Sequence, residues 1–145
     1  MSLIVAVSKE NEQEWAKLCV ALWPDNTIGD MLDELHKGEL PNEFLYYADN
    51  EAVAFISLSL RHDYVEGTES SPVGYLEGIY VKPNHRKSGF AAKMVDFAKD
   101  WAISKGCSEL ASDCSLENVD SLEFHKRIGF EEANRIICFT MSLKK

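Results

Sequence analysis

Residues 76–91 of this 145-residue chain read LEGIYVKPNHRKSGFA, and this is the most informative stretch of the sequence. It predicts a strand over 76–81, a turn at Pro83 and a helix that begins near Gly89. Arg86, Gly89 and Ala91 have the spacing Arg-x-x-Gly-x-Ala. A loop that enters a helix directs unpaired backbone N–H groups toward one point, and the helix dipole favours negative charge there. The stretch therefore indicates either a phosphate-binding loop or a basic surface turn.

The overall composition is that of a soluble globular protein. Hydrophobic residues make up 46% of the chain and charged residues 27%, and 145 residues suffice for one domain, expected over 1–145. No run of 18 apolar residues is present, and the first ten residues lack the basic segment of a signal peptide. We therefore expect no membrane segment and a cytoplasmic location.

Charge and cysteine usage exclude some classes of partner. The chain has 24 acidic and 15 basic residues and a formal net charge of −9, so a nucleic-acid partner is disfavoured. The negative charge suits either a cationic substrate or simply solubility, and composition alone does not separate the two. The four cysteines are scattered and have no histidine at the spacing of a zinc site. We expect them to be buried, reduced thiols, and we expect no metal.

The hydrophobic pattern predicts helices and strands along the whole chain. Four helices are expected, over 11–23, 27–37, 89–105 and 118–128, and six strands, over 3–7, 44–48, 53–60, 76–81, 110–114 and 136–143. This order predicts an α/β fold with an antiparallel first half and one parallel crossover through the helix that starts at Gly89. The polar segment 61–72 between two of the strands is a long loop of the kind that often carries function.

Two motifs together resemble a known family. They are the Arg-x-x-Gly-x-Ala loop and the later pattern of Asn118 followed by Phe124-His125-x-x-x-Gly129-Phe130. With the order of the elements, they are similar to the GCN5-related N-acetyltransferase superfamily over nearly the whole chain. The segments RHDYV, SSPVGYLEGIYV, ASDCSLEN and HKRIGFEEANRI resemble its bacterial aminoglycoside 6′-N-acetyltransferases. The resemblance implies a mixed, mostly antiparallel, splayed sheet with flanking helices.

The resemblance also implies acetyl-CoA as the co-substrate. The fourth and fifth strands of such a fold splay apart after a bulge, expected near Ile79 and Tyr80, and the pantetheine arm pairs with exposed backbone as an added strand does. The pyrophosphate then lies on backbone N–H groups of the loop. The residues implied to contact the cofactor are Ile79, Tyr80, Val81, Arg86, Lys87, Ser88, Gly89, Phe90, Ala91 and Asn118.

Two carboxylates are candidates for the catalytic base. An alkylammonium ion must lose a proton before it attacks a thioester, so a carboxylate or a water next to one is needed. Glu77 lies on the fourth strand and Asp113 at the end of the fifth, and the resemblance places both in the substrate pocket. Each of these two residues is equally well interpreted as a carboxylate at a strand end that is solvated or caps a neighbouring element. The sequence also does not determine whether Glu77 or Asp113 is the base.

The resemblance implies further substrate contacts. Trp23 and Tyr64 match positions that contact aminoglycoside rings, where aromatic faces attract ammonium groups. Trp23 also ends an amphipathic helix, so a role in the core or at its rim competes with substrate binding. Asn134 stands where the related pattern has an acidic residue, which weakens one contact with the cation.

His125 departs from the superfamily pattern, which often has tyrosine there as the acid that protonates the leaving thiolate. His125 is either that acid or a residue of the helix surface. A water molecule is the other candidate, and no acid at all is required, because a coenzyme thiol with a pKa of about 8.5 leaves as a thiolate.

The favoured function is transfer of an acetyl group from acetyl-CoA to the 6′-amine of an aminoglycoside antibiotic, by direct attack on the thioester. The alternatives are acetylation of another cationic amine, such as a polyamine or a protein N-terminus, and a non-catalytic CoA-binding module. The predicted last strand, 136–143, is suited to completing a neighbouring sheet, so we also expect a homodimer.

Overall fold

The computed structural model describes residues 3–38, 40 and 42–144. The chain divides into two compact units, Met1–Asp113 and Cys114–Lys145. The first unit contains the whole β-sheet and three of the helices, whereas the second contains one helix and the C-terminal segment.

The first unit is built on one five-stranded sheet with the strand order β1-β2-β3-β4-β5. All neighbouring strands are antiparallel except β4 and β5, which are parallel and are connected through helix α3. This confirms the predicted antiparallel first half and the single parallel crossover. The strands are β1 (Leu3–Ala6), β2 (Asn42–Ala48), β3 (Glu51–Arg61), β4 (Val73–Val81) and β5 (Leu110–Ser112).

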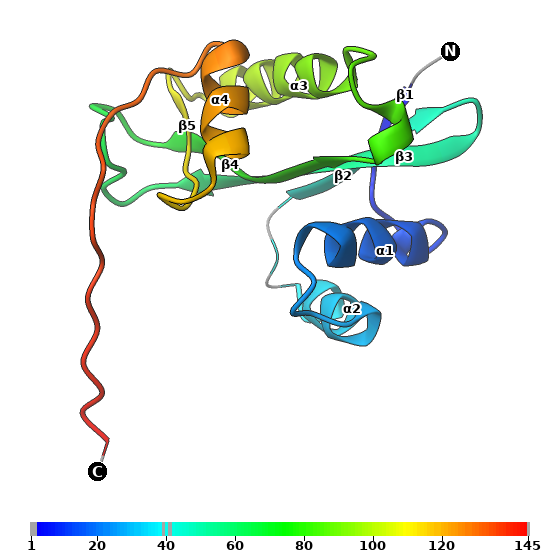
Figure 1. Cartoon of the computed structure of the whole chain (residues 1–145), viewed down its shortest axis with the longest axis horizontal. Helices are drawn as coiled ribbons and strands as arrows, with labels where there is room; N and C mark the ends of the chain where they lie inside the picture. Colours follow the sequence, from blue (N-terminus) through cyan, green and yellow to red (C-terminus); the bar gives the residue numbers. More distant parts are fainter. Residues whose placement is uncertain (1–2, 39, 41, 145) are drawn as a thin grey trace. The chain divides into compact units, whose positions relative to one another are not determined.

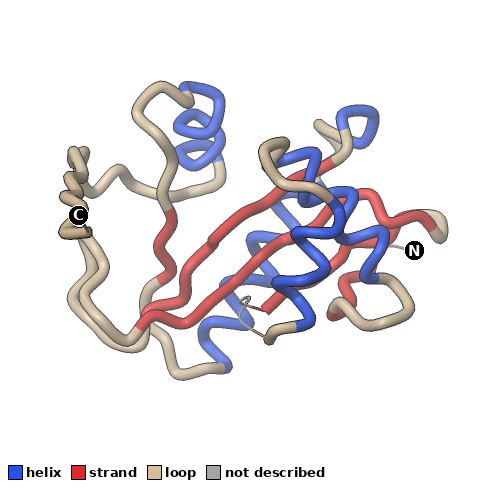
Figure 2. Tube along the Cα trace, turned by 90° about the horizontal axis from the view of Figure 1, so that it is seen from below, coloured by secondary structure: helices blue, strands red, loops and turns tan. Residues whose placement is uncertain are grey.

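Helices cover both faces of this sheet. Helices α1 and α2 lie on one face and α3 on the other (Figure 1), and Figure 2 shows the central strands running side by side beneath the helices. Each helix lies within about two residues of the range that its periodicity predicts. The three helices are α1 (Glu12–Leu22), α2 (Ile28–His36) and α3 (Phe90–Ser104), and a short 3-10 turn, Pro83–His85, precedes α3.

Local signals in the sequence start and stop these elements. Thr27 begins α2 with a capping box, in which its hydroxyl accepts from the backbone N–H of Asp30 and the Asp30 carboxylate accepts from the N–H of Thr27. The turn between β2 and β3 is formed by Asp49 and Asn50, which both have positive φ. Such a turn matches the twist of a β-hairpin, and the predicted hairpin connection is confirmed.

Alternate residues of β2 point to opposite faces of the sheet. Leu45 packs with Trp15 and Phe55 in the core cluster beneath α1, whereas Phe44 and Tyr46 contact aromatic rings of α3. This alternation assigns the odd-numbered residues of β2 to the face that α1 covers. The assignment matters for the site, because Glu43 is one of these residues.

Strand β4 contains a β-bulge at Glu77. Ser57 of β3 pairs with Gly78, but Leu58 pairs with Leu76, so Glu77 has no partner of its own on β3. The bulge expected near Ile79 and Tyr80 therefore lies two residues before Ile79. The extra residue reverses the alternation of the strand, and both Tyr75 and Tyr80 consequently lie on the face that α1 covers.

The splay of the fourth and fifth strands is confirmed. Strand β5 pairs only with Gly74, Tyr75 and Leu76. From Glu77 to Val81, β4 has no strand partner on this side within the residues that the structure describes. The open edge begins where β5 ends, since Ser112, the last residue of β5, pairs with Leu76 directly before the bulge.

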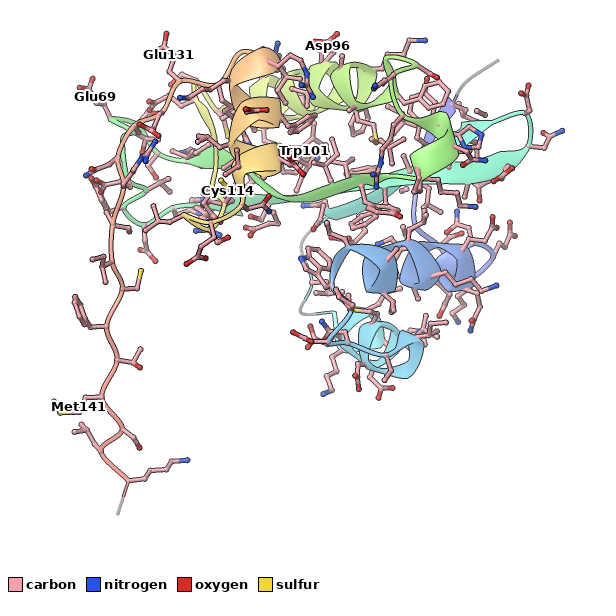
Figure 3. All side chains as sticks on the ribbon, in the orientation of Figure 1. Glu69, Asp96, Trp101, Cys114, Glu131 and Met141 are labelled. Atoms are coloured by element: carbon pink, nitrogen blue, oxygen red, sulfur yellow. The ribbon has the colours of Figure 1, made fainter. Side chains whose placement is uncertain are left out.

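The second unit contains α4 (Val119–Arg127), as predicted, followed by a segment without regular secondary structure. The predicted strand over 136–143 was wrong, since these residues are extended but pair with no described strand. Its apolar side chains, including Met141 (Figure 3), are exposed. The alternating pattern of 136–143 does encode an extended chain, but a strand also requires a partner backbone, which this pattern does not specify.

None of the helices in the described part of the chain has both the length and the apolar composition needed to cross a membrane.

Candidate active site

The carboxylate of Glu77 lies on the face of the sheet that α1 covers, in contact with two side chains of β3. Ser59 donates a hydrogen bond to Glu77 Oε2. Arg61 forms an ion pair with the same carboxylate, at 2.9 Å from Nη2 to Oε2 and 3.0 Å from Nη2 to Oε1. The Glu77 side chain remains partly exposed. Glu77 is therefore neither an isolated carboxylate nor a buried one, and a cationic ligand that approaches it meets Arg61.

Asp113, the second predicted carboxylate, is joined to Glu77 through two intermediate side chains. The Tyr75 hydroxyl donates to Asp113 Oδ2, and the guanidinium carbon of Arg61 lies 3.4 Å from the centre of the Tyr75 ring. Burial and the neighbouring Asp113 raise the pKa of Tyr75 above its ordinary value, so its hydroxyl remains a proton donor. The structure thus brings both predicted carboxylates to one group of contacts, formed by β3, β4 and the residue that follows β5.

A third carboxylate, Glu43, lies on the same face of the sheet and was not predicted. It is 7% exposed, and it accepts hydrogen bonds from Trp15 Nε1 at 2.8 Å and from the Ser57 hydroxyl. Burial raises the pKa of Glu43 to about 7, although the hydrogen bonds from Ser57 and Trp15 oppose the shift. Glu43 therefore changes charge near neutral pH.

The predicted cofactor edge on β4 has free backbone positions. The Lys82 N–H donates to Val53 O on β3, so by alternation the backbone groups of Ile79 and Val81 face the open edge and those of Tyr80 face β3. One of the exposed groups is occupied, because Arg86 Nε donates to Val81 O at 2.8 Å. The backbone groups of Ile79 and the N–H of Val81 therefore face the open edge, where an extended ligand could hydrogen-bond to them as a neighbouring strand would.

The predicted phosphate loop ends in an unusual backbone conformation. Lys87 and Gly89 both have positive φ, at 66° and 82°, and Gly89 is the N-cap of α3 without a side-chain cap. A Cβ atom at Gly89 would meet no other atom within 4 Å, so glycine is needed there for its φ and not for space. Arg86, besides its bond to Val81, lies over the Tyr80 ring at 5.3 Å. Arg86 therefore joins the loop to the strand end.

Residues 88–91 complete this loop. Ser88 is exposed, and Phe90 and Ala91 form the first turn of α3, with the Phe90 ring 4.8 Å from that of Tyr46. The contact between Phe90 and Tyr46 anchors the first turn to β2. Arg86 and Lys87 come shortly before the first turn of α3 in the chain, and the N–H groups at the start of a helix suit an anion.

Trp23 packs beside the bulge. A Cβ atom at Gly78 would come within 2.6 Å of Trp23 Cζ2, and the Trp23 ring meets Phe55 edge-on at 5.7 Å. The ring is half-buried, so its role at the rim of the core is observed. Its closeness to Gly78, the neighbour of Glu77, is compatible with the predicted substrate contact as well.

Tyr64 lies in the loop between β3 and β4 and is 77% exposed. Its hydroxyl donates to Glu66 Oε2 at 2.9 Å, and this bond raises the pKa of the Tyr64 phenol. Among the described residues, no hydrogen bond or ion pair joins Tyr64 to the group around Glu77. Its predicted role in substrate binding remains a prediction.

The remaining predicted residues belong to the second unit. Asn118 is the N-cap of α4, where its Oδ1 accepts from the backbone N–H of Ser121 at 3.1 Å. His125 Nδ1 lies 2.7 Å from Ser121 O, and it donates a hydrogen bond to this oxygen in the tautomer that has the proton on Nδ1. Asn134 lies in the irregular segment, where its Oδ1 accepts from the N–H of Arg135.

Three residues on this face of the sheet were placed outside the strands by sequence reasoning. Arg61 was assigned to a loop, and Tyr75 and Glu43 were left outside the predicted strands. A signal for Arg61 did exist, because Ser57, Ser59 and Arg61 form a polar alternation at the end of an apolar strand. Glu43 gave no comparable signal, since a single glutamate before an apolar run is typical of a strand end.

Comparison with known proteins places this geometry in context. Residues 7–130 match the family model described as acetyltransferase (GNAT) family. An aminoglycoside N(6′)-acetyltransferase type 1 from Acinetobacter haemolyticus is 38% identical, covering 97% of this chain and 98% of its own length. One from Stenotrophomonas maltophilia is 43% identical, covering 90% of this chain and 86% of its own length.

Solved structures agree with these relatives. The apo crystal structure of an aminoglycoside antibiotic 6′-N-acetyltransferase from Acinetobacter haemolyticus has a TM-score of 0.92 at 37% identity, covering 98% of this chain and 99% of that one. The structure of AAC(6′)-Iy in complex with the bisubstrate analogue CoA-S-monomethyl-acetylneamine has a TM-score of 0.89 at 36% identity, over 98% and 99% of the two chains.

The raised pKa of Glu43 makes a prediction about stability. The pKa of Glu43 in the folded protein, about 7, lies above its ordinary value of 4.5. Between these two pH values the folded state therefore holds a proton that the unfolded state has lost. This contribution is fully present below pH 4.5 and is lost as the pH rises to about 7, by up to about 3 kcal/mol. Glu43→Gln should therefore gain stability relative to the wild type between pH 5 and pH 8, as measured by urea unfolding. An equal difference at both pH values would contradict the raised pKa.

Proposed function

Because this chain belongs to the acetyltransferase (GNAT) family, we propose that it transfers the acetyl group of acetyl-CoA to the 6′-amine of aminoglycoside antibiotics. The observation that carries the proposal is its similarity, over almost its full length, to proteins named for this reaction. The proposed activity would confer resistance on a cell that contains the enzyme. The contacts around Glu77 supply a chemical reason why this chain suits such a substrate.

Acetyl-CoA supplies the acetyl group as a thioester. The open edge of β4 is suited to its pantetheine arm, with Ile79 and Val81 offering backbone groups in the manner of a sheet that gains a strand. The N–H groups at the start of α3, shortly after Arg86 and Lys87 in the chain, are suited to the pyrophosphate. Our proposal retains Tyr80, residues 88–91 and Asn118 as cofactor contacts.

The carboxylates take the proton of the amine. In this proposal Glu77 or Asp113, directly or through a water molecule, accepts a proton from the substrate ammonium group. The neutral amine then forms a C–N bond to the thioester carbonyl carbon, and the C–S bond breaks to release the coenzyme thiolate. The nitrogen loses its second proton to solvent water as the amide forms. The N–H of Val81 faces the open edge and is placed to donate to the oxygen on which charge develops. The leaving thiolate needs no acid from His125.

A cationic substrate competes with Arg61. In the free protein the guanidinium group of Arg61 neutralises Glu77, so a bound ammonium group takes over part of this ion pair. The net charge of −9 favours the approach of such a polycation. Trp23, Tyr64 and Asn134 complete the proposed set of substrate contacts.

The site is proposed to lie within one acetyltransferase domain that spans residues 1–145. Support comes from the family match over residues 7–130, which crosses the boundary between the two compact units. We propose that the enzyme acts in the cytoplasm, where its co-substrate is made, and that it uses no metal, nucleic acid or membrane.

We further propose that the protein is a homodimer. The support is the extended C-terminal segment, whose alternate residues Ile137, Phe139, Met141 and Leu143 are all exposed, Phe139 to 87%. Such a segment buries its apolar side chains when it pairs with a second chain. Light scattering should give twice the monomer mass of 16.4 kDa, and Phe139→Asp should shift the mass toward the monomer. A wild type that is monomeric at all concentrations would refute the dimer.

The first test of the function compares two aminoglycosides that differ only in a 6′-amine or a 6′-hydroxyl. Consumption of acetyl-CoA should occur with the amine alone. Turnover of both compounds would retain the chemistry but move the reaction to another amine. Binding of CoA without turnover of either would favour another amine substrate or a non-catalytic CoA-binding module.

The carboxylates are tested by Glu77→Gln and Asp113→Asn. Removing the base should lower kcat by roughly 10²- to 10⁴-fold, while acetyl-CoA binding, measured by calorimetry, is retained. Glu34→Gln, on the exposed surface of α2, serves as a control that removes the same charge elsewhere. Unchanged kinetics in both site variants would rule out these two residues as the base.

A further inference from the structure

Glu43 is a buried carboxyl that the proposed reaction does not use. It lies on β2, directly opposite Ser57 on β3, and the backbone N–H of Val7 donates to its carbonyl oxygen on the other side. Burying a carboxyl is costly unless it is hydrogen-bonded, and two donors, Trp15 and Ser57, are directed at this one. The fold thus holds an ionisable group where an apolar residue would be less costly.

The sheet places Glu43 close to the candidate base. Ser57 and Ser59 are two residues apart on β3 and therefore point to the same face, and they contact Glu43 and Glu77 respectively. The two glutamates belong to strands on either side of β3, so their backbones are about 10 Å apart, or two strand spacings. A charge on Glu43 therefore acts on the same face of the sheet as Glu77.

We propose that Glu43 is a positioning residue for the transfer: by gaining and losing a proton beside Ser57 and Trp15, it sets how strongly the face around Glu77 attracts a cationic substrate. This inference rests on the proposed function. As Glu43 ionises, the face gains a negative charge and an ammonium group binds more tightly. By linkage, a bound cation in turn favours the ionised form of Glu43.

The other charged or titratable groups near Glu43 are consistent with this role. From α1, Cys19 faces it as a thiol whose pKa is raised by burial and by Glu43, so Cys19 stays neutral. From β4, Glu77 opposes the ionisation of Glu43, and Arg61 neutralises Glu77. The neighbouring position on the β1 side is the apolar Val7. Burial raises the pKa of Glu43 itself to about 7.

The test measures kcat and KM for a 6′-amino aminoglycoside from pH 5.5 to pH 8.5. Glu43→Gln should match the wild type at pH 5.5, where Glu43 is protonated. At pH 8.5 its KM should be roughly three- to tenfold higher than that of the wild type, while kcat changes less than threefold. The Glu34→Gln control should follow the wild type throughout, since titration of the substrate amines is common to all the enzymes.

A second variant separates this role from a structural one. Ser57→Ala removes a hydrogen bond that favours the ionised carboxyl, so the pH at which KM changes should move upward, whereas in Glu43→Gln the change is absent. A KM ratio between Glu43→Gln and the wild type that is constant across pH would overturn the inference. The inference would also be overturned if the pH at which KM changes were the same in Ser57→Ala as in the wild type. Ser57→Ala provides the test on its own if Glu43→Gln fails to fold.

Failure of the inference and failure of the proposed function give different results. A wild type that acetylates the 6′-amine while the variants show no pH-dependent difference overturns the inference alone. A wild type without turnover overturns the proposed function. The affinity of the wild type and of each variant for neamine is then measured by calorimetry across the same pH range, and the ratio of these affinities replaces the KM ratio. Absence of neamine binding at every pH overturns both.

Discussion

The bulge of β4 at Glu77 is the constraint on which the rest of the site depends. Strand β4 has one residue more than β3 between the pairs Ser57–Gly78 and Leu58–Leu76, and this reverses the alternation of β4. Glu77, Gly78 and Tyr80 consequently lie on the face that α1 covers. The pairing with β5 ends directly before the bulge, which leaves β4 without a strand partner on that side from Glu77 to Val81 in the described part of the chain. The carboxylate and the open edge therefore begin at the same point of β4.

Charge on this face is balanced rather than simply negative. Arg61 pairs with Glu77 and lies on the Tyr75 ring, and Tyr75 donates to Asp113, so the two predicted carboxylates belong to one connected group. Glu43 adds a third carboxyl whose burial keeps it partly neutral near pH 7. Such a group attracts a cation without holding three bare negative charges close together, which would be costly.

Much of the fold could be predicted because its signals are local. Thr27 with Asp30, the Asp49-Asn50 turn and the apolar stripe of α3 each depend on residues within a few positions. The strand over 136–143 was wrong for the opposite reason, since its apolar alternation specifies an extended chain but no partner. The bulge was expected near Ile79 and Tyr80 but its position, at Glu77, could not be read from one strand, because a bulge depends on the register of two strands.

The order of the elements, the parallel crossover and the loop around Gly89 could be read from the sequence alone, because they follow from periodicity and from turn chemistry. The choice of Glu77 and Asp113 as candidate site residues came from the resemblance to the acetyltransferase family. Only the tertiary structure decided that Arg61 and Tyr75 join those carboxylates, that Arg86 is tied to Val81, and that Glu43 is buried beside Ser57. These contacts join residues that lie on different strands or beyond a strand end, and the register of the sheet sets which side chains meet.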